Sequence, residues 1–155
     1  MGKRRNARES ALQVLYHLDF DDIPSEDALR LYWRERKAPD DVKDYTGWIV
    51  SGIISHRKMI DEIIHSHSDN WRISRMAVVD RNVLRIAVFE LVFEKNIAAA
   101  IILDEAIEIV KKFSSEQAAN FVNGILDSIN KNIKTIKKTF EDKENDGHRG
   151  KSKNS

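Results

Sequence analysis

The most regular feature of this sequence is the spacing of its apolar residues. They recur at intervals of three and four along most of the chain, as on one face of an α-helix, and no stretch keeps the alternation of a β-strand. Only two prolines and six glycines interrupt the pattern. An all-α fold is therefore expected. The spacing predicts helices over about residues 6–19, from Ser25 onward, and over about 42–64, 74–94, 98–113 and 115–132, the last with room to extend to Thr139.

Two of these helices carry a further signal. The apolar stripe over residues 42–64 is long for one globular helix, so a bend near Ser55–Lys58 is expected to divide it. Ser114 and Gln117 stand three residues apart, as in a capping box, and predict where the last helix starts.

The chain is expected to form one domain over residues 1–140, because 155 residues suffice for a single core. Its N-terminal helical half spans about 4–70 and its C-terminal half about 74–139. The last segment, EDKENDGHRGKSKNS, contains no apolar residue. That composition predicts a disordered polar tail over residues 141–155.

The composition narrows the class of protein. Charged residues make up 33% and apolar residues 41% of the chain, as in globular proteins, and the formal net charge is +1. The lack of cysteine excludes disulfides and thiol chemistry, and it suits a reducing cytoplasm. No apolar run reaches the roughly 18 residues that a membrane-spanning helix needs, so no membrane association is expected.

Motifs of catalysis are missing from the sequence. His65 and His67 stand two apart and do not share a helix face, so a metal site is not expected there. The aspartates after residue 18 begin like a calcium loop, but Ile23 and Pro24 occupy positions that require an oxygen ligand and a glycine. The glycines are too scattered for a phosphate-binding loop. We therefore expect neither enzyme activity nor a cofactor.

Positive charge is concentrated at the start of the chain, in Lys3, Arg4, Arg5 and Arg8. Cations at a helix N-terminus are unfavourable for the helix dipole, so their placement needs another reason. One interpretation is a solvated terminus. The other is a phosphate-binding surface, since Arg4 and Arg8 are four apart, with the amide of Gln13 and a Tyr ring further along the helix for contacts to single-stranded RNA.

Four blocks of the sequence resemble one known family: RRNARESALQVLY, MAVVDRNVLRIAVFEL, AAAIILDEAIEIVKKF and FVNGILDSI. In order and spacing they are similar to segments of the NusB family of transcription antitermination factors, which read R-R-x-A-R-x-x-A-L-Q-x-L-Y, D-R-x-x-L-R-x-A-x-x-E-L, V-A-I-N-E-A-V-E-L-A-K-K-F and F-V-N-G-V-L-D-x-I. The resemblance covers roughly residues 3–132.

The resemblance implies a compact bundle of six to seven helices arranged as two small helical subdomains. It also implies a function. Members bind a single-stranded RNA element, boxA, in the leaders of ribosomal RNA operons, together with the ribosomal protein NusE. The complex helps RNA polymerase to pass terminators, which implies a cytoplasmic protein without catalytic activity.

Position by position, the resemblance implies a set of binding residues. Asp80 falls on the helix that faces NusE and is a candidate partner contact. The candidate RNA-binding residues are Lys3, Arg4, Arg5, Arg8, Gln13, Tyr16, Lys111, Lys112 and Phe121. Three positions depart from the family pattern: Asn6 replaces a basic residue of some members, Ser114 the usual Gly, and Asn120 the usual Lys.

Other residues in the matching blocks are interpreted as structural. Gly124 would permit close helix packing and Asn123 would satisfy a neighbouring backbone group. Arg85, amid apolar residues, would pair within the chain, with Glu90 or Glu105. Two other functions stay open: the NusB-like portion of a ribosomal RNA cytosine methyltransferase, and a helical protein–protein adaptor whose basic start serves solubility.

Overall fold

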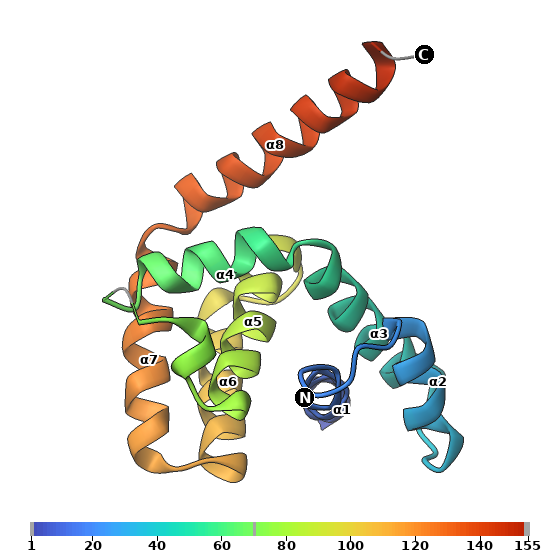
Figure 1. Ribbon diagram of the computed structural model, residues 1–155. Coiled ribbons are helices and arrows are strands. Elements are labelled where there is room, and N and C mark those ends of the chain that lie inside the picture. The colour runs from blue at the N-terminus through green and yellow to red at the C-terminus, as the bar shows by residue number, and fades with distance from the viewer. Residues whose placement is uncertain (1, 70, 154–155) are drawn as a thin grey trace.

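The computed structural model describes residues 2–69 and 71–153, with side chains as far as residue 144 (Figure 1). Over these residues the secondary structure is helical throughout, which confirms the all-α prediction. The helix count slightly exceeds the expected six to seven. The elements are α1 (Gly2–Leu18), α2 (Ser25–Arg34), α3 (Asp40–Ser55), α4 (Arg57–Ser66), the 3₁₀ turn η1 (Ile73–Arg75), α5 (Val78–Phe93), α6 (Ala99–Phe113), α7 (Glu116–Lys131) and α8 (Ile133–Lys153).

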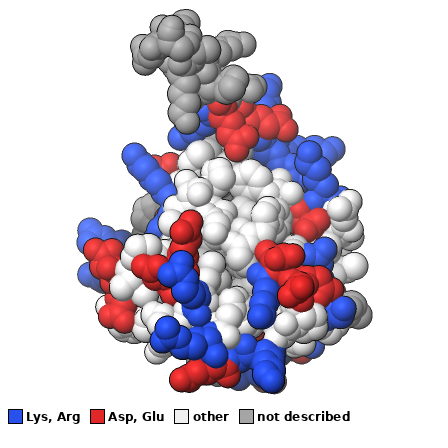
Figure 2. All heavy atoms as spheres, turned by 90° about the vertical axis from the view of Figure 1, so that its right-hand side faces the viewer, with Lys and Arg blue, Asp and Glu red and all other residues white. Residues whose placement is uncertain are grey.

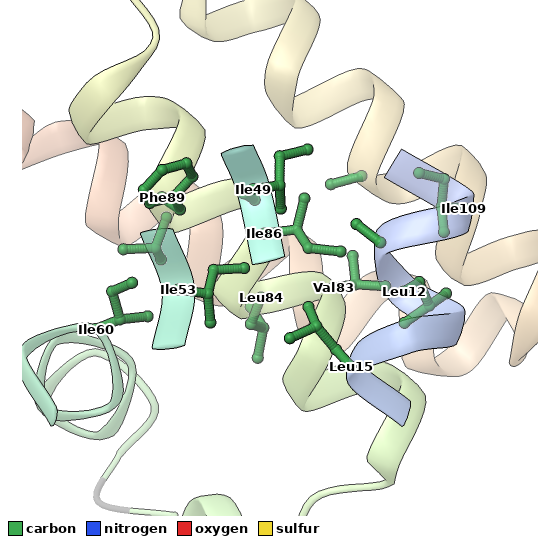
Figure 3. Close-up of a cluster of buried hydrophobic side chains, with 14 of the residues drawn as sticks. Leu12, Leu15, Ile49, Ile53, Ile60, Val83, Leu84, Ile86, Phe89 and Ile109 are labelled. Atoms are coloured by element: carbon green, nitrogen blue, oxygen red, sulfur yellow. The ribbon is translucent and has the colours of Figure 1, made fainter. Parts of the chain in front are cut away.

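Helix α5 lies at the centre of the molecule. It contacts α1, α3, α4, α6, α7 and α8, and most of its side chains are buried. Its leucine, isoleucine and valine side chains meet those of α1, α3 and α6 in one continuous core (Figure 3). A helix that is apolar on nearly every face needs neighbours on nearly every side. The two expected halves therefore share this helix as a common core element.

The predicted bend between two helices is confirmed at His56. Helix α3 ends at Ser55 and α4 begins at Arg57. The His56 N–H donates to the carbonyl oxygens of Gly52 and Ile53, as in the tightened last turn of a helix. Because the chain turns here, the apolar stripe of α4 reaches α5 from a different direction than that of α3.

Several predicted helix starts differ from the observed ones, including that of α5, which begins at Val78 instead of near Ser74. Helix α1 begins at Gly2 instead of near Asn6, so the basic residues belong to its first turns. The N-cap of α7 is Ser115, whose hydroxyl accepts a hydrogen bond from the Ala118 N–H at 3.0 Å. Ser114 instead ends α6, with a backbone conformation outside the helical region.

The last helix, α8, differs from the expected tail. It projects from the body (Figure 1) and continues to Lys153. The sequence pattern, in contrast, predicts that the helix ends near residue 139. Ile136 and Phe140 are its buried apolar side chains. The sequence after Phe140 contains no proline, so no residue there removes a backbone N–H from the helix.

The close helix packing expected at Gly124 occurs at Gly52 instead. Gly124 is exposed, and a Cβ added there would meet nothing within 4 Å. A Cβ on Gly52 would overlap the ring of Phe89. The glycine that permits α3 to approach α5 therefore lies outside the segments that prompted the prediction.

Candidate nucleic-acid interface

The four cations at the start of α1 have different environments. Lys3 is exposed and pairs with Asp41 at 3.0 Å. The guanidinium of Arg4 lies over the Tyr45 ring, 3.8 Å from its centroid, in a cation–π contact. Arg5 is half-exposed and forms two hydrogen bonds, of 2.6 and 2.9 Å, with the carboxylate of Glu105. Intramolecular partners thus account for much of the positive charge at this end.

Arg8 is buried, at 3% exposure, and donates two hydrogen bonds, of 2.7 and 2.9 Å, to Glu90. Tyr45 donates to the same carboxylate at 2.6 Å. Burial alone would lower the pKa of Arg8, but the hydrogen bonds and charge of Glu90 outweigh it and raise the pKa. The predicted phosphate contact of Arg8 does not fit this geometry, because its guanidinium is enclosed and already bidentate. It joins α1 to α5 instead.

Further along α1, Gln13 and Tyr16 face solvent. Tyr16 is 44% exposed, so it does not belong to the core beside Leu12. Its ring contacts that of Phe20, with centroids 5.2 Å apart, and Phe20 is exposed as well. The Gln13 side-chain oxygen accepts from the Tyr32 hydroxyl at 3.1 Å, which leaves the amide NH₂ for other partners. This part of α1 presents aromatic rings and an amide.

The end of α6 lies beside α1. Lys111 and Lys112 are exposed, and Lys112 pairs with Glu9 of α1 at 2.9 Å. Phe113, at 37% exposure, follows them directly. The predicted basic segment of α6 and the basic helix α1 are therefore neighbours in space, although about 100 residues separate them along the chain.

Next to the turn between α6 and α7 there is a groove of about 390 Å³, which lies between the start of α5 and the start of α7. Its lining residues include Asp80, Ser114, Gln117, Phe121 and Trp71. Phe121 is half-buried and its ring meets that of Trp71 edge to face, with centroids 6.0 Å apart. The groove therefore combines two aromatic rings with polar groups.

Asp80 is the unusual side chain of this groove. It is 8% exposed, and its Oδ1 has no hydrogen-bond partner among the described residues. Burial raises the pKa of the Asp80 carboxyl, and interaction with the Ser114 hydroxyl offsets only part of this rise. A buried acceptor without a donor is costly, so this position favours a ligand or partner that supplies an N–H or O–H.

A cluster of ion pairs and hydrogen bonds around Asp19 holds the C-terminal end of α1 against α5. The Asp19 carboxylate accepts from Asn82 at 2.8 Å, from Arg81 at 3.1 Å and from Arg57 at 3.2 Å. Burial alone would raise the pKa of Asp19, but the hydrogen bonds from Asn82 and Arg81 and the charges of Arg85 and Arg81 hold it below its usual value.

Arg85 belongs to the same cluster, between Asp19 and Asp61. The prediction that Arg85 pairs within the chain is confirmed, but the expected partners are wrong. Glu90 and Glu105 are taken by Arg8 and Arg5.

The contacts above connect several of the predicted residues into one band, whereas Lys3 and Arg4 pair with residues of α3. Lys112 touches Glu9, Ser114 approaches Asp80, and the neighbouring Arg81 reaches Asp19. The band thus runs from the exposed side of α1, past the α6–α7 turn, to Phe121. Trp71 and Phe20 extend it and were missed by the sequence analysis. For Trp71 the signal was available, since it stands next to Arg72 and close to Arg75.

Overall charge does not mark this band. The formal net charge of the chain is only +1. Figure 2 shows another face, the side of α2 and α3, where basic and acidic side chains surround a central area without charged side chains. Any attraction to a polyanion must therefore come from local groups. In the helices that the structure describes, no segment is long and apolar enough to cross a membrane.

Comparisons with known proteins agree with the fold. Residues 5–131 match the NusB family. The transcription antitermination protein NusB of Syntrophus aciditrophicus (strain SB) is 43% identical over 129 residues, which cover 83% of this chain and 80% of that protein.

Two solved structures are also similar. NusB of T. maritima is 39% identical, with a TM-score of 0.77, over 83% of this chain and 90% of that one. In a crystal structure of the antitermination factors NusB and NusE in complex with double-stranded RNA, the matching chain is 33% identical, with a TM-score of 0.76, over 84% of this chain and 98% of that one.

Proposed function

The chain belongs to the NusB family, and we propose that it binds single-stranded boxA-type RNA from ribosomal RNA operon leaders together with NusE. The family consists of transcription antitermination factors, not enzymes. Within the antitermination complex on RNA polymerase, in the cytoplasm, its task is to hold the RNA and the ribosomal protein at the same time.

One observation supports this proposal most directly: the band brings together aromatic rings, amides and cations from segments far apart in sequence. Tyr16 is exposed beside Phe20, Lys111 and Lys112 lie next to α1, and Phe121 lines the groove. Unpaired bases stack on aromatic rings, while cations hold the phosphates. A known relative with this fold has been crystallised with NusE and RNA.

The residues are proposed to make different contacts. Lys3, Arg4, Lys111 and Lys112 are exposed and can reach phosphates. Arg5 is half-exposed and already bidentate to Glu105, so its main effect is on the position of α1. Tyr16 and Phe121 supply stacking surfaces, and Gln13 a base-edge contact. Asp80, with an unsatisfied acceptor at the groove, is proposed to take a donor from NusE.

The test is a binding titration of the full chain. Affinity for a single strand carrying a boxA sequence is compared with a scrambled strand of equal composition, with and without NusE. Tighter binding of the boxA strand, with further tightening by NusE, is expected. By linkage, RNA must tighten NusE binding by the same factor.

The variant Tyr16→Ala should weaken RNA binding by about 1–3 kcal/mol with little change in stability, because its ring is exposed. Equal affinity for both strands in every condition would instead favour a protein–protein adaptor.

A further inference from the structure

We infer that Trp71, with Arg72 and Arg75, forms an additional site for one unpaired nucleotide, which extends the RNA-binding band beyond Phe121. The inference rests on the proposed RNA-binding function and names a further site for the same strand. The site lies on the segment between α4 and α5 and on η1, opposite the start of α7.

The first support is the exposure of a large aromatic ring. Trp71 is 52% exposed, while its edge-to-face contact with Phe121, at 66° between ring planes, holds it beside the groove. An exposed tryptophan offers a wide surface on which any base can stack. The same ring borders both the groove of Asp80 and a second hollow of about 420 Å³.

The second support is the charge of that second hollow. Its lining residues are Asp69, Trp71, Arg72 and Arg75, two cations against one anion. Within the described part of the chain, neither arginine forms an ion pair, unlike Arg5 and Arg8 of α1. Unpaired guanidinium groups next to an exposed aromatic ring fit a nucleotide, because the ring takes the base and the cations take its phosphate.

The third support is the fixed backbone of Trp71. Its N–H donates to the Ser68 carbonyl at 3.0 Å, and its own carbonyl oxygen lies 3.0 Å from Nδ1 of His65. The Ser68 hydroxyl donates to the same oxygen at 3.4 Å. A ring on a backbone held in this way loses little entropy when a base stacks on it.

The experiment measures RNA affinity and tryptophan fluorescence together. Trp71→Ala should weaken binding of the boxA strand about 5- to 160-fold, the effect of losing one stacked base, without changing the salt dependence. Arg72→Ala with Arg75→Ala should instead flatten the plot of log affinity against log salt by about 1.4, for two phosphate contacts on a single strand.

Trp48 provides the matched control. It is a second exposed tryptophan, at 38%, on α3, and it packs on Phe89 away from the groove. Trp48→Phe keeps an aromatic ring beside Tyr45 and Arg4 and should leave RNA affinity unchanged. RNA should quench the fluorescence of the wild type and of Trp48→Phe, and this quenching should be lost in Trp71→Phe, which keeps an aromatic ring for the fold.

The outcomes separate this inference from the proposed function. If the wild type binds no RNA, the proposed function fails and the inference fails with it. If the wild type binds RNA but Trp71→Ala and Trp71→Phe behave like Trp48→Phe, only the nucleotide site is wrong. A loss of NusE affinity with unchanged RNA affinity would also overturn it, since the surface would then belong to the protein partner.

Discussion

At the scale of single residues, two arginines four positions apart have opposite roles. Arg4 and Arg8 lie on the same face of α1 as the buried Ala11, Leu12 and Leu15, yet only Arg8 is enclosed. The spacing in the sequence indicates this shared face but does not separate the two arginines. The partner of Arg8 was not visible in the sequence either, because Glu90 comes from another helix 82 residues away.

Arg8→Ala should therefore destabilise the protein by about 3–5 kcal/mol, since it leaves the Glu90 carboxylate buried without its cation. Arg4→Ala removes an exposed cation from the Tyr45 ring and should lower the free energy of unfolding by at most about 1 kcal/mol. Urea denaturation of both variants measures the difference. Equal stabilities would show that the Arg8 pair contributes nothing to the fold.

Asp80 allows a prediction about pH. Its pKa is raised in the folded state, so the folded chain holds the proton more tightly than the unfolded chain, and Asp80 lowers stability as pH rises above its ordinary range. Asp80→Asn removes this effect. The variant should gain roughly 1 kcal/mol relative to wild type at pH 7 and less at pH 4. Thermal melts at both pH values check this, and a gain that is larger at pH 4 would contradict it.

At the scale of elements, periodicity located the helices better than their ends. The stripes predicted both ends of α6 and the C-terminal end of α5 to within a residue, and the excess length over residues 42–64 predicted the break at His56. The residue at which a helix ends depends on the local backbone geometry, and the residue type alone does not determine that geometry. Both Ser114 and Ser115 could cap a helix, and the choice of Ser115 follows from the turn after α6. The packing glycine likewise depends on which residue faces a neighbouring ring.

Gly52→Ala should destabilise the protein by about 1–3 kcal/mol, because its methyl group would overlap the Phe89 ring between α3 and α5. Gly124→Ala is the control, also in a helix interior but with open space around it. It should stabilise the protein by about 0.5–1 kcal/mol through helix propensity. Melting temperatures of the two variants should move in opposite directions, and two shifts of the same sign would remove Gly52 from the role of packing contact.

At the scale of the whole molecule, the sequence predicted the fold class, but not how its cations are used. The resemblance of four blocks indicated the arrangement of helices, and Tyr16 and Lys112 are exposed, as the proposed binding surface requires. The net charge did not indicate a binding surface. Because Arg4 and Arg8 are close in sequence, the two were assigned the same role. Only the packing of α1 on α5 and α6 distinguishes cations that hold the fold from cations that remain for a ligand.

The salt dependence of RNA binding should follow that distinction. If the exposed Lys3, Arg4, Lys111 and Lys112 each contact a phosphate, log affinity should fall with log salt at a slope of about −3 for single-stranded RNA. Lys3→Ala with Arg4→Ala should flatten this slope by about 1.4. Lys131→Ala, at the opposite end of α7 from the groove, removes an equally exposed cation and should leave the slope unchanged. Filter binding at several salt concentrations measures all three slopes. A wild-type slope in the double variant would mean that the start of α1 is a solvated terminus and that its remaining cations serve only the fold.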